Sequence, residues 1–230
     1  MNRRTTQGRT SGRVTMSFLL PLILGLSGCG FNRESAPGQL LDLGPPPGAV
    51  SGPASAPASS AAAAHGEPVA VRFSGAQMLA RTGVIWRVGD SASLHYYATY
   101  RWAASPLQLV QQRVVRTLSA ARPVVLDGAD PFAPLLQISL TRFEQVYAPD
   151  GKSSVGAVAM QAVLVRDHRV AGSIVLSRSS PAPTQDAQGG VAALRTATGY
   201  IADDLAAWLR LCLSAPASAS TEDPASGLSR

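Results

Sequence analysis

Histidine and cysteine are the side chains of this 230-residue chain with the widest chemical range, and their spacing supports no metal site. The three histidines, His65, His95 and His168, are scattered, and no cysteine or carboxylate lies near them at the spacing of a zinc or calcium site. The sequence also lacks a phosphate-binding glycine loop and the standard hydrolase motifs. We therefore expect no metal, no cofactor and no enzyme activity.

One serine has neighbours that could make it a nucleophile. Gly89-Asp90-Ser91 is similar to the nucleophile block of GDSL-type esterases, in which a histidine activates the serine and an aspartate orients the histidine. The Asp-x-x-His partner expected near the C-terminus is missing, because Asp167 and His168 are adjacent and no histidine follows them. We favour a turn between two strands, and a lipid-anchored esterase that uses Ser91 is the least favoured alternative.

The thiol of Cys29 follows a segment with the order of a secretion signal. Residues 1–13 are basic and residues 16–27 are apolar and uncharged. The apolar run has 12 residues, whereas a membrane-spanning helix needs about 20, so we expect no permanent span. Leu26-Ser27-Gly28-Cys29 resembles the lipobox of bacterial lipoproteins, which implies cleavage before Cys29 and acylation of that residue, with palmitate among the acyl chains.

Acylation would make Cys29 a membrane anchor. Each buried methylene contributes about 0.8 kcal/mol, so two or three acyl chains hold a protein stably where one would be marginal. Gly30 follows the cysteine where an aspartate would, by resemblance to the sorting rule of enteric bacteria, signal retention in the inner membrane. We therefore expect the outer membrane. The alternative is an ordinary cleaved signal that leaves a free thiol.

The basic character of the chain belongs mostly to this leader. The net charge is +6, but residues 1–28 contain four arginines and no acid. The rest of the chain has 16 basic and 14 acidic residues, and Lys152 is its single lysine. Because the remaining arginines are spread among acids, we expect no nucleic-acid binding.

Composition divides the chain into segments. Residues 44–66 consist almost entirely of Pro, Ala, Gly and Ser, which cannot form a core, so they are typical of a tether. The expected segments are a signal peptide (1–28), the lipidated Cys29 with a short first strand and the tether (29–66), a folded domain (67–213) and a disordered tail (214–230).

Periodicity predicts both strands and helices inside the folded segment. Two helices are expected, at 106–120 and along an apolar face that recurs from Val191 to Trp208 and ends near Leu213. The region 179–188 between the last strand and the second helix is expected to be a polar loop. The predicted strands are 69–73, 84–88, 94–100, 136–141, 154–165 and 170–176, the last three forming an antiparallel meander with turns at 148–151 and 167–169.

These elements predict an α+β fold. A mostly antiparallel sheet with both amphipathic helices packed on one face would bury the apolar faces of all three, which gives a two-layer sandwich. On this fold, Cys212 is expected to be a small core residue. Tyr96, Tyr97, Tyr100 and Trp102 form an aromatic cluster that could contact lipid or a partner protein, with packing inside the sheet as the alternative.

Several segments in this order resemble a known family. They are the lipobox, Leu41-Asp42-Leu43-Gly44-Pro45, Ile85-Trp86-Arg87, the strand 94–100, Arg101-Trp102-Ala103-Ala104-Ser105-Pro106, Phe143-Glu144-Gln145-Val146-Tyr147 and the terminal helix 193–208. Together they are similar to the auxiliary lipoproteins of ABC-type transporters, the PqiC-like family that accompanies lipid transport systems with mammalian-cell-entry (MCE) domains. The resemblance spans most of residues 39–211. The long Pro/Ala insert before Glu67 departs from the family pattern.

The resemblance implies a non-catalytic role. It implies a lipoprotein that faces the periplasm from the outer membrane, docks with an MCE-domain protein and the ABC permease and ATPase subunits, and helps lipid or another hydrophobic solute cross the envelope. A homo-oligomer is one possible assembly. The alternative function is a structural envelope lipoprotein that binds cell wall or another outer-membrane protein, which the tether and the missing catalytic residues also fit.

Overall fold

The computed structural model describes residues 38–45, 66–126 and 129–214. The expected signal peptide, the acylation site Cys29, nearly all of the tether and the tail from residue 215 lie outside the described residues.

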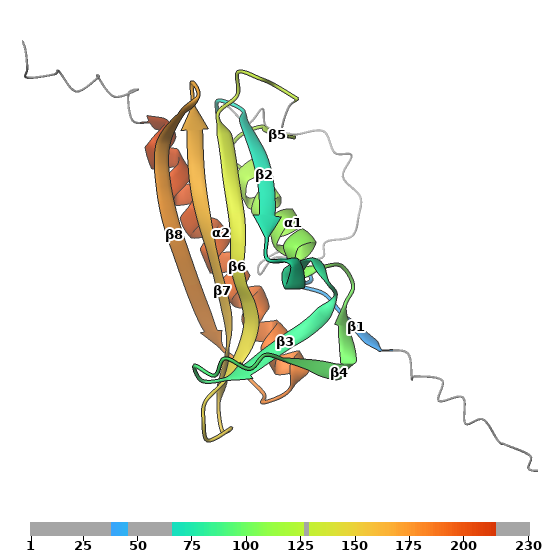
Figure 1. Ribbon diagram of the computed structural model, residues 1–230. Coiled ribbons are helices and arrows are strands. Elements are labelled where there is room, and N and C mark those ends of the chain that lie inside the picture. Colours follow the sequence, from blue (N-terminus) through green and yellow to red (C-terminus); the bar gives the residue numbers. More distant parts are fainter. Residues whose placement is uncertain (1–37, 46–65, 127–128, 215–230) are drawn as a thin grey trace, which may run out of the picture. The chain divides into compact units, whose positions relative to one another are not determined.

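One mixed sheet and two helices make up the described part (Figure 1). The sheet follows the order β1-β4-β3-β6-β2-β5, and β7 and β8 continue it from the other edge of β6. The elements are β1 (Gln39–Leu41), β2 (Val69–Gly75), the short 3-10 helix η1 (Gln77–Ala80), β3 (Gly83–Val88), β4 (His95–Trp102), α1 (Pro106–Ser119), β5 (Val124–Leu126), β6 (Leu135–Tyr147), β7 (Ser154–Arg166), β8 (Arg169–Pro181) and α2 (Ala187–Ser214).

The predicted meander is confirmed. β6, β7 and β8 pair antiparallel along almost their full lengths. The chain turns between β7 and β8 at Asp167 and His168, whose φ angles are 52° and 60°. Two consecutive positive φ angles are typical of the tight turns whose twist matches that of the flanking strands.

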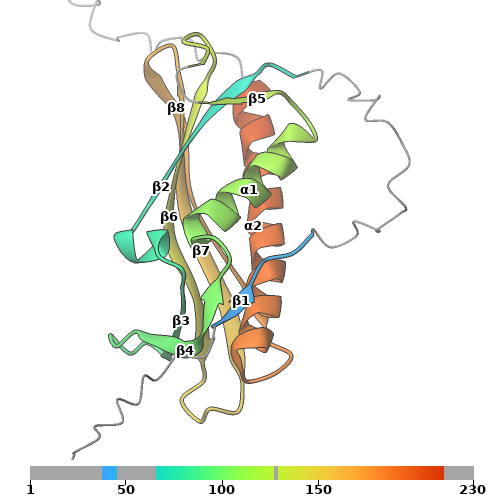
Figure 2. The same cartoon turned by 90° about the vertical axis from the view of Figure 1, so that its right-hand side faces the viewer.

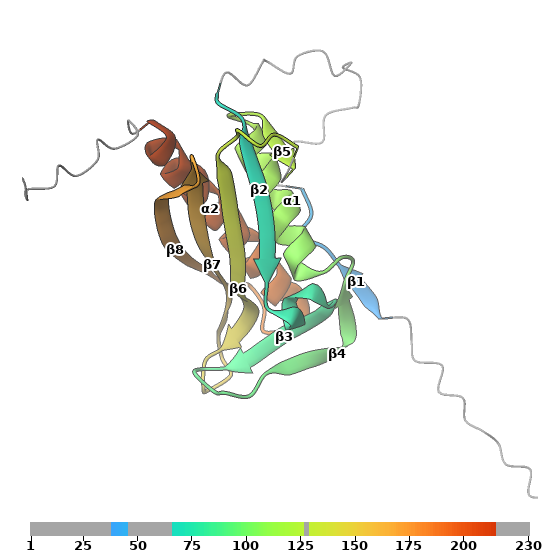
Figure 3. The same cartoon turned by 45° about the horizontal axis from the view of Figure 1, so that its top comes forward.

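The remaining strands are shorter and mostly parallel to their neighbours. β2 and β3 lie one after the other along one edge of β6, with Ala70 opposite Leu135 and Trp86 opposite Gln145. β3 and β4 form an antiparallel hairpin, and β1 pairs parallel to β4 at the outer edge (Figure 3). The three antiparallel pairs include the two longest ladders in the sheet.

Both helices cover the same face of the sheet (Figure 2). α2 packs on β6, β7 and β8, whereas α1 packs on β2 and against α2. The predicted α+β two-layer sandwich is therefore confirmed. Ser105 caps α1 as its sequence suggests: its hydroxyl accepts a hydrogen bond from Gln108 N, and Pro106 takes the first helical position.

The boundary between β8 and α2 differs from the expectation. Ser179–Pro181, expected in a loop, continue β8 because β7 extends far enough to pair with them, with Val155 opposite Pro181. α2 then begins at Ala187. An edge strand tolerates this polar sequence, since one side of its backbone needs no partner. The strand β5 was also not anticipated.

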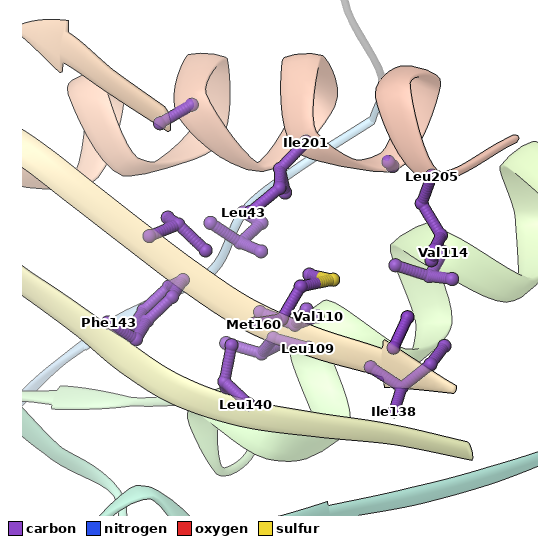
Figure 4. Close-up of a cluster of buried hydrophobic side chains, with 14 of the residues drawn as sticks. Leu43, Leu109, Val110, Val114, Ile138, Leu140, Phe143, Met160, Ile201 and Leu205 are labelled. Carbon is purple, nitrogen blue, oxygen red and sulfur yellow. The ribbon is translucent and has the colours of Figure 1, made fainter. Parts of the chain in front are cut away.

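The core fills the space between the sheet and the helices (Figure 4). Leu140 on β6 and Met160 on β7 face Ile201 and Leu205 on α2, and all four are 0% exposed. Leu43, from the N-terminal segment 38–45, joins the same cluster. This segment is therefore part of the folded domain, although residues 46–65 separate it from β2 in the sequence.

Candidate functional site

A groove of about 490 Å³ lies where the β3–β4 hairpin meets the turn between β6 and β7. Its lining residues are Trp86, Val88, Tyr96, Tyr97, Ala98, Tyr147, Ala148, Pro149 and Gly151, and none of them is charged. We call this site the aromatic groove. Apolar and aromatic walls of this kind are typical of sites for hydrophobic ligands or partners.

Strand register brings the aromatic rings together. Trp86 lies opposite His95 on β4, and their rings stack with centroids 4.4 Å apart. On the other side of β3, Val88 lies opposite Tyr147 of β6, which places the Tyr147 ring edge-on to Trp86 at 5.7 Å. The β3–β4 hairpin and β6, which is far from it in the sequence, therefore build one aromatic surface.

Hydrogen bonds hold the floor of the groove. The Tyr97 hydroxyl lies 2.8 Å from Gln145 Oε1 and 2.6 Å from the Tyr147 hydroxyl. Gln145 is 0% exposed, and its Nε2 donates to Ser154 Oγ at 2.8 Å. A buried amide needs such partners, because an unpaired polar group in a core is costly. The network fixes the two tyrosines at the groove.

α2 comes close to this network at a glycine. A Cβ at Gly190 would overlap Gln145 Oε1, so any larger residue there would push either the helix or the amide away. The glutamine and the glycine therefore fit each other across the two layers of the fold. The sequence contains both residues, but nothing in their spacing indicates this contact.

Tyr97 stays uncharged over the ordinary pH range. Burial raises the pKa of Tyr97 well above its usual value, and the hydrogen bond with Tyr147 raises it further. Tyr97 is therefore a neutral hydroxyl at physiological pH. Its two bonded partners leave it little capacity to act as an acid or a base.

A buried carboxylate supports the groove from the neighbouring strands. Glu144 is 3% exposed, and its Oε1 lies 2.8 Å from Arg87 Nε and 2.6 Å from Arg142 Nε. Arg87 is on β3, so this ion pair ties β3 to β6 next to Trp86. A buried charge requires such partners, and its role here is to hold the strands in place.

The four aromatic residues of the expected cluster lie in different environments. Tyr96 is 50% exposed, and its ring lies over Gly83, where a Cβ would come within 2.5 Å of Tyr96 Cδ1. Tyr97 lines the groove, and Tyr100 packs edge-on against it at 5.9 Å. Trp102 is 1% exposed and packs on Phe143, so it offers almost no surface to a partner.

Trp86 and Tyr147 line the groove and Gln145 lies beneath it, but none of the three was among the predicted site residues. A sequence pattern relates residues that lie on one strand or on one helix face. These three residues lie on two different strands, β3 and β6. The parallel pairing of β3 with β6 brings them together, and no motif in the sequence indicates that pairing.

Ser91 lies in a turn. Its backbone N–H donates to Val88 O, and its hydroxyl accepts a hydrogen bond from Ser93 N. The His95 ring stacks on Trp86, and His168 lies in the turn at the far end of β7. The turn interpretation of Gly89-Asp90-Ser91 is therefore confirmed.

Cys212 on α2 packs at the border of the core, and burial raises the pKa of its thiol, which keeps it protonated. Among residues 38–45, 66–126 and 129–214, no group of His, Cys, Asp or Glu could hold a metal ion. Within the same ranges, no helix is both long and apolar enough to cross a membrane.

Comparison with known proteins gives a family and a fold. A crystal structure of a protein from Xanthomonas campestris has 20% sequence identity and a TM-score of 0.55, with 64% of this chain and 84% of that chain covered. A crystal structure of an uncharacterized protein has 16% identity and a TM-score of 0.54, with 62% and 92% covered. No curated protein matches.

The model of the ABC-type transport auxiliary lipoprotein component matches residues 50–206, which is more than half of the sequence. This chain therefore belongs to the family of ABC-type transport auxiliary lipoprotein components.

Proposed function

We propose that this protein is a non-catalytic accessory of an ABC-type system with an MCE-domain subunit, and that it helps lipid or another hydrophobic solute cross the envelope. The family match over residues 50–206 carries the proposal, because auxiliary transport components assist a transporter whose ATPase lies elsewhere. An uncharged aromatic groove on the domain agrees with contact to a hydrophobic solute or partner.

The protein would act from a membrane anchor. Cleavage of the signal peptide 1–28 would leave Cys29 as the acylated first residue, and the absence of Asp at position 30 supports the outer membrane, with the domain in the periplasm. Residues 29–66 would link the anchor to the domain, and residues 214–230 would form a tail.

The contact surface would be centred on the aromatic groove. Tyr96 and Tyr97 are the members of the predicted cluster that line it, with Tyr100 packed behind Tyr97. Trp102 would contribute indirectly by holding the end of β4 in the core.

Affinity purification tests this proposal. A C-terminally tagged copy would be purified from crosslinked, detergent-solubilised membranes of the source cell, and the co-purifying proteins identified by mass spectrometry. We expect MCE-domain, permease and ATPase subunits, and we expect Cys29→Ala to lose both the membrane fraction and these partners. Reproducible recovery of cell wall or other outer-membrane proteins without transporter subunits would favour the structural envelope lipoprotein.

A further inference from the structure

We propose that the end of the sheet that carries the aromatic groove docks on the lipid surface in which the Cys29 anchor is inserted. The inference deepens the proposed function and rests on it for the anchor alone. It names what the groove contacts, namely the boundary between head groups and acyl chains.

The chain enters the described fold beside β4. Gln39 of β1 lies opposite Tyr100 in a parallel register, and the position of a Cβ on Gly38 would be 3.4 Å from Thr99 O. Because the two strands run parallel, the N-terminal end of β1 faces the part of β4 that leads to Tyr96. This is the strand that supplies Tyr96 and Tyr97 to the groove.

Chain length limits how far this strand can lie from the membrane. Eight residues lie between Cys29 and Gly38 in the sequence, and the nine extended steps from one to the other span at most about 30 Å. An anchor at Cys29 would therefore hold β4 close to the lipid surface.

The side chains around the exit point suit a lipid interface. Tyr96 is 50% exposed, Leu40 on β1 is 68% exposed and Val88 on β3 is 38% exposed. Tyrosine and tryptophan are enriched at membrane interfaces, where a ring lies among apolar groups and its polar atom stays near water. Trp86, Tyr96 and Tyr147 provide such rings, and the groove between them has no charge to desolvate.

The opposite end of the sheet provides an internal comparison. Phe132, just before β6, is 93% exposed, and the 13 residues of β6 separate that end from Tyr147 by about 40 Å. The hollow beside Phe132 is lined by Asp130 and Asp167 as well as apolar residues. An exposed aromatic ring alone therefore does not distinguish the two ends, whereas the position of β1 and the uncharged lining of the groove do.

Depth-dependent fluorescence quenching tests the inference. The full-length acylated protein would be reconstituted into phosphatidylethanolamine–phosphatidylglycerol vesicles that contain lipids brominated at successive acyl positions, with no other protein present. Trp86 is the only tryptophan in the groove lining. We expect emission to be quenched most by the shallowest bromines, and we expect most of this quenching to be lost in Trp86→Phe.

Matched tyrosines separate docking from general destabilisation. Tyr96→Ser should reduce the quenching of Trp86, whereas Tyr200→Ser should not, although Tyr200 on α2 is similarly exposed at 56%. Phe132→Ser should also leave the quenching unchanged. Circular dichroism would verify that every variant is folded.

The quenching experiment distinguishes failure of the inference from failure of the proposed function. If the protein is acylated and attached but Trp86 is not quenched, the inference is wrong and the proposed function stands. If transporter subunits have to be added before the Trp86 emission changes, the groove is a protein-docking surface and the inference is also wrong. If mass spectrometry finds no acyl chain on Cys29 and the protein does not attach, the anchor in the proposed function fails together with the inference.

Discussion

The meander of β6, β7 and β8 and the sector formed by β1, β3 and β4 use one sheet in two different ways. In the meander, long antiparallel ladders bury Leu140, Met160 and Leu164 completely under α2. In the other sector, the strands are short and leave Leu40, Val88 and Tyr96 exposed. The meander therefore supplies much of the buried core, whereas the other sector carries the aromatic groove, and the polar network at Gln145 lies between them.

Two leucine substitutions should show the largest difference between the sectors. Leu164 is 0% exposed and Leu40 is 68% exposed. Leu164→Ala should lower the free energy of unfolding by about 3 kcal/mol, because it leaves a cavity in the core. Leu40→Ala should change it by less than about 0.5 kcal/mol. Urea denaturation measures both, and similar losses would contradict the division into sectors.

Two glycines on α2 should give effects of opposite sign. Gly190→Ala should cost about 1–3 kcal/mol, because its Cβ would overlap Gln145. At Gly199 a Cβ meets nothing within 4 Å, so Gly199→Ala should stabilise the helix by up to about 1 kcal/mol. Thermal unfolding of the two variants compares them directly. If both stabilise the protein, the contact between α2 and the groove network is not important.

The cap on the first turn of α2 should contribute less to the free energy of unfolding than the Gly190 contact does. Asp186 Oδ1 accepts a hydrogen bond from Gly189 N at 2.7 Å, which caps the helix beside the groove network. Asp186→Ala should cost about 1 kcal/mol, and Asp186→Asn, which keeps an acceptor, should cost less. The bond to Gly189 N and the Thr184 hydroxyl lower the pKa of Asp186. Its contribution is present above the unfolded pKa and should disappear as pH falls through the lower folded pKa, which acid titration of stability measures.

The smallest effect should be confined to alkaline solution. The pKa of Tyr97 is raised in the folded state, first by burial and then by Tyr147. The stability that this shift provides is present below about pH 10, the ordinary pKa of tyrosine, and is lost as pH rises further. Tyr97→Phe should therefore flatten the decline of stability above that pH. An unchanged decline in urea titrations would mean that another group causes it.

The sequence predicts the meander of β6, β7 and β8 better than the sector formed by β1, β3 and β4. The alternation Leu136, Ile138, Leu140 and the helical spacing along α2 arise from burial on one face, so local patterns predict the meander, both helices and the fold class. The end of β8 was missed because the partner strand β7, rather than the side chains of Ser179 and Ser180, determines that it is extended.

The candidate site could be predicted only in part. Tyr96 and Tyr97 are neighbours on one strand, so the sequence alone indicates an aromatic cluster there. Trp86, Tyr147 and Gln145 reach them only because β3 pairs parallel with β6, a contact that depends on the topology. Trp102 was predicted as part of the same contact cluster, but it lies at the end of the same strand with its side chain buried in the core.

The pairing of β1 also determines which part of the domain would detach first under a mechanical load. A pull on the chain from the side of Cys29 would act first on β1, which has three paired residues, and on the bond between Arg113 and the Gly44 carbonyl. The ladders of β6, β7 and β8 would carry no load until this segment had come away. Release would then add the 20 residues from 46 to 65, up to about 70 Å of extended chain. If Cys29 carries the proposed anchor, detachment of β1 would lengthen the chain between the anchor and the domain while β6, β7 and β8 stay paired.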